Sequence, residues 1–297
     1  MLASRSSVLN LLAKLPIAAL LLSCSTLAHA DVYGALKSGF GSDEYRSHAL
    51  ELEADITSAT QLNFDYLLVQ SANVDDLRQS GIGLDWDVNP TLSASYHHTK
   101  IGDDRVDVSG NEIGLSLELN TLWESDLRTT IGVGYGDNKF TTHRTNIVNP
   151  QGLTQSQSML NISQNITPTF AVYGSHAQYR YDRNVAGLAL LLLRRTSNTS
   201  KIGLTLLEFP QKTNTAGISW KPSESLNLDL SFGKTVTLLE QRQSNTLLGL
   251  DYQLNEKLNL LANVSQSRST AIIRPNGTTA QAETQDTFTE LGAGWAF

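Results

Sequence analysis

Two adjacent histidines, His97 and His98, are the residues whose type most directly suggests metal chemistry. Imidazole nitrogens bind zinc when several ligands converge on one ion. The residues around this pair fit a β-strand, in which neighbouring side chains point to opposite faces. We therefore expect one imidazole on each face of the strand, where the two cannot share an ion.

An acidic stretch from Gly102 to Asp107 is the second candidate for metal chemistry. Asp103, Asp104 and Asp107 offer carboxylate oxygens, which are ligands that calcium prefers. The stretch lacks the full ligand spacing of a calcium loop and its closing Glu. We expect a solvated loop here, and we expect neither a metal ion nor another cofactor in this protein.

The charge balance argues against a nucleic-acid partner. The 297-residue chain has 22 Lys and Arg against 29 Asp and Glu, a net charge of −7. Removal of a leader that contains Arg5 and Lys14 leaves 20 bases against 29 acids, a net charge of −9. Phosphate contacts require clustered Lys and Arg, so the composition excludes an ordinary nucleic-acid binder.

The first 30 residues have the features of a secretory signal peptide. Arg5 and Lys14 precede an apolar stretch from Leu15 to Leu22, and Ala28 and Ala30 form a final Ala-x-Ala. The apolar stretch is shorter than the roughly 20 residues that a spanning helix needs. We predict cleavage after Ala30, with residues 1–30 as the signal peptide and 31–297 as one domain. The alternative is a lipoprotein acylated at Cys24.

The rest of the chain alternates with a period of two residues. Ile82, Leu84, Trp86 and Val88 interleave with Gly83, Asp85 and Asp87, and the same pattern recurs in many later segments. Alternate residues of a strand share a face, so each segment has one apolar and one polar face. The longest apolar run, Val185 to Leu193, has the length of a strand.

These segments predict an all-β protein, a transmembrane antiparallel β-barrel of about 16 strands. The polar faces carry Gly, Ser, Asn and charges in mid-strand, and short turns alternate with longer connections, which is typical of a barrel that is apolar outside and polar inside. The least certain strands are 185–194 and 200–209. If those residues form one long loop, the count is 14.

The end of the chain adds a separate signal. Leu291, Ala293, Trp295 and Phe297 alternate with Glu290, Gly292, Gly294 and Ala296. This resembles the C-terminal signal strand of Gram-negative outer-membrane β-barrels, which the barrel-assembly machinery reads. The resemblance implies a location in the bacterial outer membrane, with membrane lipid and that machinery as partners. The alternative is a soluble periplasmic β protein that happens to end in Phe.

The polar faces of the predicted strands are rich in acids. Their parity places the following acids inside the barrel: Glu51, Glu53, Asp55, Asp65, Asp85, Asp87, Glu112, Glu118, Asp229, Asp251 and Glu290. The clear inward bases are Lys37, Arg128 and Lys221. An acidic lumen favours cations. Alternatively, these acids pair with bases, accept hydrogen bonds across strands or are simply solvated, with no transport role.

The function predicted from these features is a porin-like channel or an export pore, which would transport a solute or a polymer and could belong to a secretion or export complex. The second reading is a non-conducting surface adhesin, anchor or assembly partner. An outer-membrane hydrolase is the third. The sequence contains no Ser-Asn-Gly segment resembling a barrel phospholipase, while Asp103, Asp104 and His143 offer a weak resemblance to an omptin-like protease. We therefore predict a protein that is not an enzyme.

Overall fold

The computed structural model describes residues 31–42, 44–71, 74–103, 106–120, 127–142, 152–183, 209–238, 240–273 and 279–297. The predicted signal peptide, with Ala28 and Ala30, lies outside these ranges, and cleavage after Ala30 stays a prediction. No helix in the described part of the chain is long and apolar enough to cross a membrane.

The described residues form long strands in an all-antiparallel order. Their bounds are β1 (Val32–Gly41), β2 (Arg46–Thr57), β3 (Thr60–Ser71), β4 (Val74–Asn89), β5 (Leu92–Gly102), β6 (Val106–Glu118), β7 (Thr129–Thr142), β8 (Thr154–Thr167), β9 (Phe170–Tyr181), β10 (Pro210–Ser223), β11 (Leu226–Thr237), β12 (Arg242–Asn255), β13 (Leu258–Ser269), β14 (Ile272–Ile273), β15 (Thr279–Gln281) and β16 (Thr284–Ala296).

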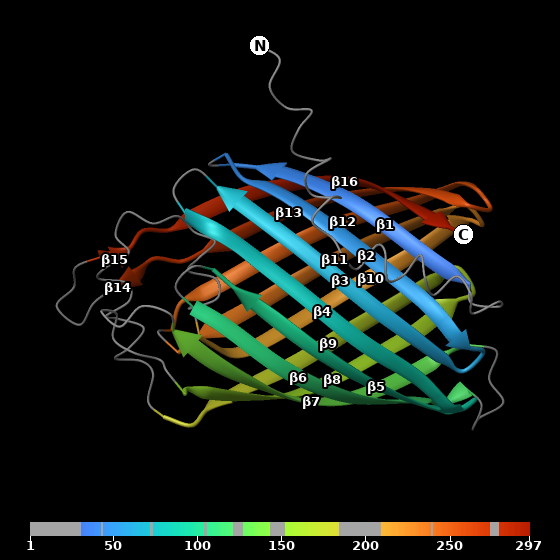
Figure 1. Ribbon diagram of the computed structural model, residues 1–297, viewed down its shortest axis with the longest axis horizontal. Helices are drawn as coiled ribbons and strands as arrows, with labels where there is room; N and C mark the ends of the chain where they lie inside the picture. The colour runs from blue at the N-terminus through green and yellow to red at the C-terminus, as the bar shows by residue number, and fades with distance from the viewer. Residues whose placement is uncertain are drawn as a thin grey trace, which may run out of the picture.

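Fourteen of these strands close into one barrel, in which each strand pairs with the next barrel strand along the chain and β16, which follows β13 in the ring, returns to pair with β1 (Figure 1). The short strands β14 and β15 form a separate two-stranded sheet. The prediction of an all-β antiparallel barrel is confirmed. The lower of the two predicted strand counts is correct, and the count of 16 is wrong.

The two surplus strands of the higher count are the segments 185–194 and 200–209. Apart from Phe209, these segments lie outside the described residues. In the described wall, β9 pairs directly with β10 over nine residue pairs, from Lys212 with Gln178 to Trp220 with Phe170. The ring therefore closes without a hairpin between these two strands.

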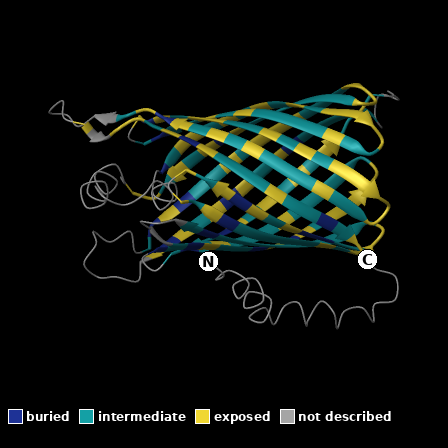
Figure 2. Ribbon diagram, turned by 90° about the horizontal axis from the view of Figure 1, so that it is seen from above, coloured by how far each residue is buried: buried dark blue, intermediate teal, exposed yellow. Residues whose placement is uncertain are grey.

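The alternating pattern of the sequence divides the wall into two faces. Residues opposite each other on antiparallel strands share a face. The large apolar side chains at alternate positions, such as Ile113, Leu115 and Leu117 on β6, are exposed, and exposed and less exposed residues alternate along the strands (Figure 2). These exposed side chains lie on the outer face, as expected of a wall that contacts lipid.

Short turns connect the strands at one end of the barrel. Side chains close several of them: Asn89 Oδ1 accepts hydrogen bonds of 2.9 Å from the backbone N–H groups of Thr91 and Leu92, and Asn255 Oδ1 accepts one of 2.9 Å from Lys257. Asn favours such turns because its side chain replaces a backbone acceptor. The connection from Glu118 to Thr129 is the longer one at this end. The longest connections lie at the other end, as between Tyr181 and Pro210 and between Ser269 and Thr284.

The seam between the first and last strands is fully paired. Tyr33 to Gly41 on β1 face Ala296 to Phe288 on β16. Beyond the last pair, the backbone N–H of Phe297 donates a hydrogen bond of 2.9 Å to the carbonyl oxygen of Val32. The rings of Trp295 and Phe297 meet edge to face, with centroids 6.0 Å apart. The terminal aromatic therefore lies at the point where the barrel closes.

We predict that Phe297→Ala lowers the amount of folded barrel in the membrane, because this residue belongs to the strand that resembles an assembly signal and that also closes the wall. The measurement is the fraction of protein that migrates faster when it is loaded unheated on a gel. Phe232→Ala, which removes another exposed aromatic from the middle of β11, serves as the control. Equal folded fractions for the two variants would contradict the prediction.

Candidate functional site

The face opposite the exposed apolar side chains is the inner face of the barrel, and it is the candidate functional surface. The strand register places the eleven acids that the sequence assigned to the lumen on this face. Lys37 and Lys221 occupy the same parity, and Arg128 immediately precedes β7. The role of each of these residues depends on the groups that it contacts.

Two of the acids form ion pairs with a base on a neighbouring part of the wall. Lys37 Nζ lies 2.6 Å from Glu51 Oε1, where β1 runs beside β2. Arg128 lies 2.7 Å from Glu118 Oε2, at the short-turn end of β6 and β7. Both pairs join adjacent strands, so they lie along the wall and do not bridge the lumen.

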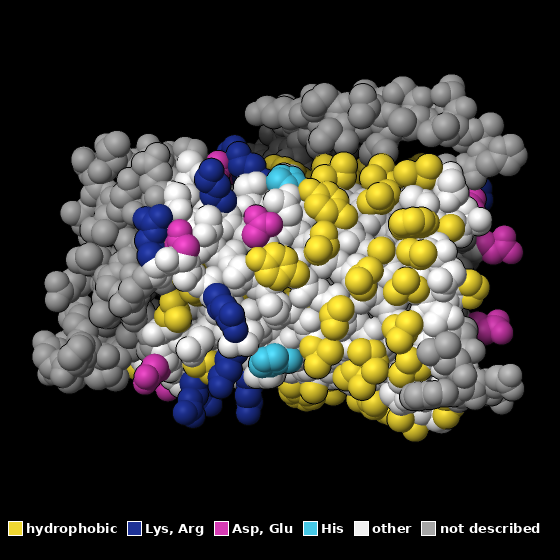
Figure 3. Space-filling view, turned by 90° about the horizontal axis from the view of Figure 1, so that it is seen from below, with side chains coloured by type: hydrophobic (Ala, Val, Ile, Leu, Met, Phe, Trp, Pro, Cys, Tyr) yellow, Lys and Arg dark blue, Asp and Glu magenta, His cyan; other side chains and the backbone are white. Residues whose placement is uncertain are grey.

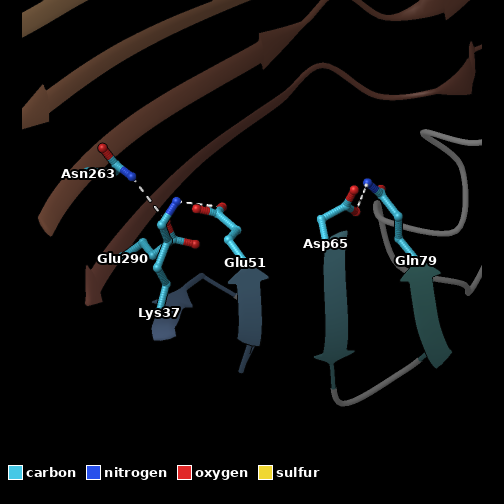
Figure 4. Close-up of polar contacts among 6 residues, drawn as sticks. All are labelled: Lys37, Glu51, Asp65, Gln79, Asn263 and Glu290. Atoms are coloured by element: carbon cyan, nitrogen blue, oxygen red, sulfur yellow. Dashed lines mark hydrogen bonds and ion pairs between the residues drawn. The ribbon is translucent and has the colours of Figure 1, made fainter. Parts of the chain in front are cut away.

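Several other acids accept hydrogen bonds from amide side chains. Gln79 Nε2 donates to Asp65 Oδ2 over 3.3 Å, and Asn263 Nδ2 donates to Glu290 Oε1 over 3.0 Å (Figure 4). Asn63 likewise donates to Asp85. A neutral amide leaves the charge of the carboxylate in place while it fixes the position of the group. These hydrogen bonds therefore hold the acids against the wall and bring no basic group to them.

Two of the hydrogen bonds reach across an intervening strand. Gln157 on β8 donates to Glu112 on β6 over 2.8 Å, and Tyr173 on β9 donates to Asp229 on β11 over 2.7 Å. The strand between each pair carries a glycine at the crossing point, Gly136 on β7 and Gly217 on β10.

Glycine at these positions allows long side chains to lie flat. A Cβ atom built on Gly217 would overlap the ring of Tyr173, and one built on Gly83 would overlap the imidazole of His97. Without a Cβ, the neighbouring side chain can lie close to the backbone of the strand. Side chains that lie along the wall occupy less of the lumen than side chains that project into it.

A cavity of about 430 Å³ opens at the short-turn end, between the ends of β8 and β13. Its lining includes Lys221, Asp251, Ser219 and Asn227. Asp251 Oδ1 is buried and has no hydrogen-bond partner within the described part of the chain. Lys221 and Asp251 therefore share one hollow at this mouth of the barrel.

An apolar cluster lies at the opposite, long-connection end. It consists of the buried side chains Val106, Val108, Phe140, Leu153 and Phe209. Val106, Val108 and Phe140 have the parity of the inner face. The ring centroids of Phe140 and Phe209 are 5.8 Å apart. The two ends of the barrel thus differ, with a polar mouth at the short turns and apolar packing near the long connections.

The other candidates for chemistry are separated in space. His97 faces inward, with Nε2 3.6 Å from Asp85 Oδ1, whereas His98 faces outward, with Nδ1 2.9 Å from Asn111 Oδ1. Asp103 Oδ1 accepts a 2.8 Å hydrogen bond from the Val106 N–H and so closes its own turn. Asp104 and His143 lie outside the described residues. Within the described part of the chain, no group of three His, Cys, Asp or Glu residues is placed to hold a metal ion.

Sequence reasoning did not identify the partners of the acids or one further inward acid. Asp286 on β16 has inner parity, is 5% exposed, and accepts a 2.9 Å hydrogen bond from Ser42 Oγ. Glycines that face long polar side chains, such as Gly217 beside Tyr173, could indicate where a side chain crosses a strand to reach an acid. That signal requires the register between strands, which alternation alone does not provide.

No family model and no curated protein matches this chain. Among solved structures, the CymD monoaromatic hydrocarbon channel is 9% identical, covers 94% of this chain and 92% of its own, and has a TM-score of 0.51. An anion-selective porin from Comamonas acidovorans is 9% identical over 91% of this chain and 99% of its own, with a TM-score of 0.46. The KdgM porin in complex with disordered oligogalacturonate is 9% identical over 89% and 99%, with a TM-score of 0.44. The fold is that of a porin-like outer-membrane β-barrel.

We predict that Gly217→Val destabilises the barrel by about 1–3 kcal/mol, because the new side chain would displace Tyr173 and break its hydrogen bond to Asp229. Gly174→Val is the matched control. A Cβ atom at Gly174 would have one ordinary contact, at 3.4 Å from the Thr215 carbonyl oxygen. The measurement is the free energy of unfolding by urea in detergent micelles or vesicles. Similar losses for the two variants would contradict this account of the inner wall.

Proposed function

We propose that this barrel is a channel of the bacterial outer membrane, not an enzyme, and that its acidic lumen prefers cations. The observation that carries the proposal is the unequal division of charge between the two faces of the wall. The inner parity holds the eleven acids named above and Asp286, against the three bases Lys37, Arg128 and Lys221.

The ion pairs leave most of this negative charge uncompensated. Lys37 and Arg128 are occupied by Glu51 and Glu118. Hydrogen bonds from Gln79, Gln157 and Asn263 reach further acids without neutralising them. A channel wall with an excess of one sign raises the local concentration of the opposite ion. Barrels larger than the filled eight-stranded kind enclose ligand cavities or channels.

The proposed solutes are small hydrophilic cations. Polar and charged groups line the inner face of the described strands, and rings of carboxylates favour cations in pores. One channel that shares this fold, CymD, is named for monoaromatic hydrocarbons. That difference in solute is compatible with a shared fold, because the inward side chains and not the strand topology determine selectivity.

We predict that the purified barrel conducts ions in a planar bilayer and that its reversal potential in a KCl gradient indicates cation preference. The triple variant Glu51→Gln, Glu53→Gln and Asp55→Asn should reduce that preference, because it removes three neighbouring inward charges and leaves Lys37 without its ion-pair partner. The field is screened over roughly 8 Å at physiological salt, so the preference should increase as the salt concentration is lowered.

The matched control is Asp76→Asn, Asp107→Asn and Asp137→Asn, which removes the same number of charges from the outer parity of β4, β6 and β7. This control should keep the wild-type reversal potential. A barrel that does not conduct, an anion-selective wild type, or equal effects of the two triple variants would each overturn the proposal.

A further inference from the structure

The outward side chains change from apolar at the short-turn end of the barrel to polar and then basic at the long-connection end. On β12 the outward residues begin at the short-turn end with Leu254, Tyr252, Leu250 and Leu248, which are 37–50% exposed. Thr246 and Ser244 follow, and Arg242 comes last. On β11 the series Leu226, Leu228, Leu230 and Phe232 is followed directly by Lys234.

The same order continues on the two preceding strands. On β10, Trp220, Ile218 and Ala216 are followed by Asn214 and Lys212. On β9, the series ends with His176, Gln178 and Arg180. We call the four exposed bases Arg180, Lys212, Lys234 and Arg242 the basic arc, because they lie on four adjacent strands at the long-connection end.

Figure 3 shows a related division on one face of the molecule. Hydrophobic side chains gather towards the short-turn end, and charged side chains, Lys and Arg together with some Asp and Glu, lie beyond them towards the long connections. The polar residues between the two zones include hydrogen-bonded pairs, such as His176 Nδ1 with Asn214 Oδ1 at 2.8 Å. On β9, β10 and β12, polar side chains therefore separate the apolar zone from the bases.

Two outward bases outside the arc lie beside an acid. Lys100 lies 3.0 Å from Asp107, and Arg268 lies 2.5 Å from Glu283. Within the described ranges, none of the four arc residues makes an ion pair. Lys212 lies opposite Gln178 and Val236, and Lys234 lies opposite Asn214 and Ser244, so successive residues of the arc are diagonal neighbours, about 7–8 Å apart.

We propose that the basic arc binds the phosphate groups of anionic lipid in the membrane leaflet on the long-connection side. The long connections of such barrels face the cell exterior, which makes this the outer leaflet. An occupant of this surface must place apolar chains against the apolar zone and negative charge immediately above it. A phosphorylated lipid has both parts in that order, and each Lys or Arg near a charged headgroup surface contributes to the attraction.

The proposal does not depend on conduction, and its test is a binding measurement on the folded full-length barrel in non-ionic detergent. The probes are lipid A with both phosphates, lipid A without phosphate, phosphatidylcholine and inorganic phosphate. Native mass spectrometry measures the lipids retained, and a titration gives the apparent Kd. The variant combines Arg180→Gln, Lys212→Gln, Lys234→Gln and Arg242→Gln, and its charge-preserving control combines Arg180→Lys, Lys212→Arg, Lys234→Arg and Arg242→Lys.

We expect phosphorylated lipid A to bind the glutamine variant about tenfold more weakly or worse than wild type, and the control to bind almost as wild type does. Phosphate-free lipid A and phosphatidylcholine should bind weakly to all three proteins. Equal binding of wild type and the glutamine variant, or full competition by inorganic phosphate, would overturn the proposal.

Salt dependence gives a second readout that needs no variant. Wild-type binding should weaken as salt rises from about 0.1 M to about 1 M, because the screening length falls from about 10 Å to about 3 Å. Binding that does not change with salt would also overturn the proposal, whether or not the variants fold.

Discussion

Closure of the backbone hydrogen-bond ladder is the constraint on which the rest of the structure depends. In a lipid environment an unpaired N–H or C=O group costs several kcal/mol, so a sheet can span a membrane when it has no free edge. Here β1 and β16 remove the last two edges by pairing along their length. Once the ring is closed, every strand has one face towards the outside and one towards the lumen, and the period of two divides the side chains between them.

That division explains why alternation alone predicted so much. Ile113, Leu115 and Leu117 are exposed on β6, as a lipid-facing parity requires. The strand count was harder to predict because it depends on residues 184–208. The run Val185 to Leu193 is uniformly apolar and does not alternate, so its length suggested a strand while its pattern did not distinguish strand from loop.

The contacts on the inner face could not be predicted from the sequence, for a different reason. Parity assigns Glu112 and Asp229 to one side of the wall, but their partners Gln157 and Tyr173 come from strands two positions away. To find these partners one needs the register of two successive strand pairs and a glycine at the crossing point. That Trp295 belongs to a closing strand was easier to predict, because the alternation of residues 290–297 is local.

The two faces carry opposite charge for related physical reasons. A base on the outer face can lie above the apolar zone, where its long aliphatic stem covers apolar surface and its charged end reaches the headgroups. A short acid cannot do this within the apolar zone, so the acids at that level lie on the polar side, where Gln79 and Asn263 donate hydrogen bonds to two of them. The outward acids Asp76, Asp107 and Asp137 lie towards the long-connection end. Placement by side-chain length and burial therefore concentrates acids in the lumen and bases at the outer rim. Selectivity for cations inside and affinity for anionic lipid outside would then follow from the same pattern of alternation.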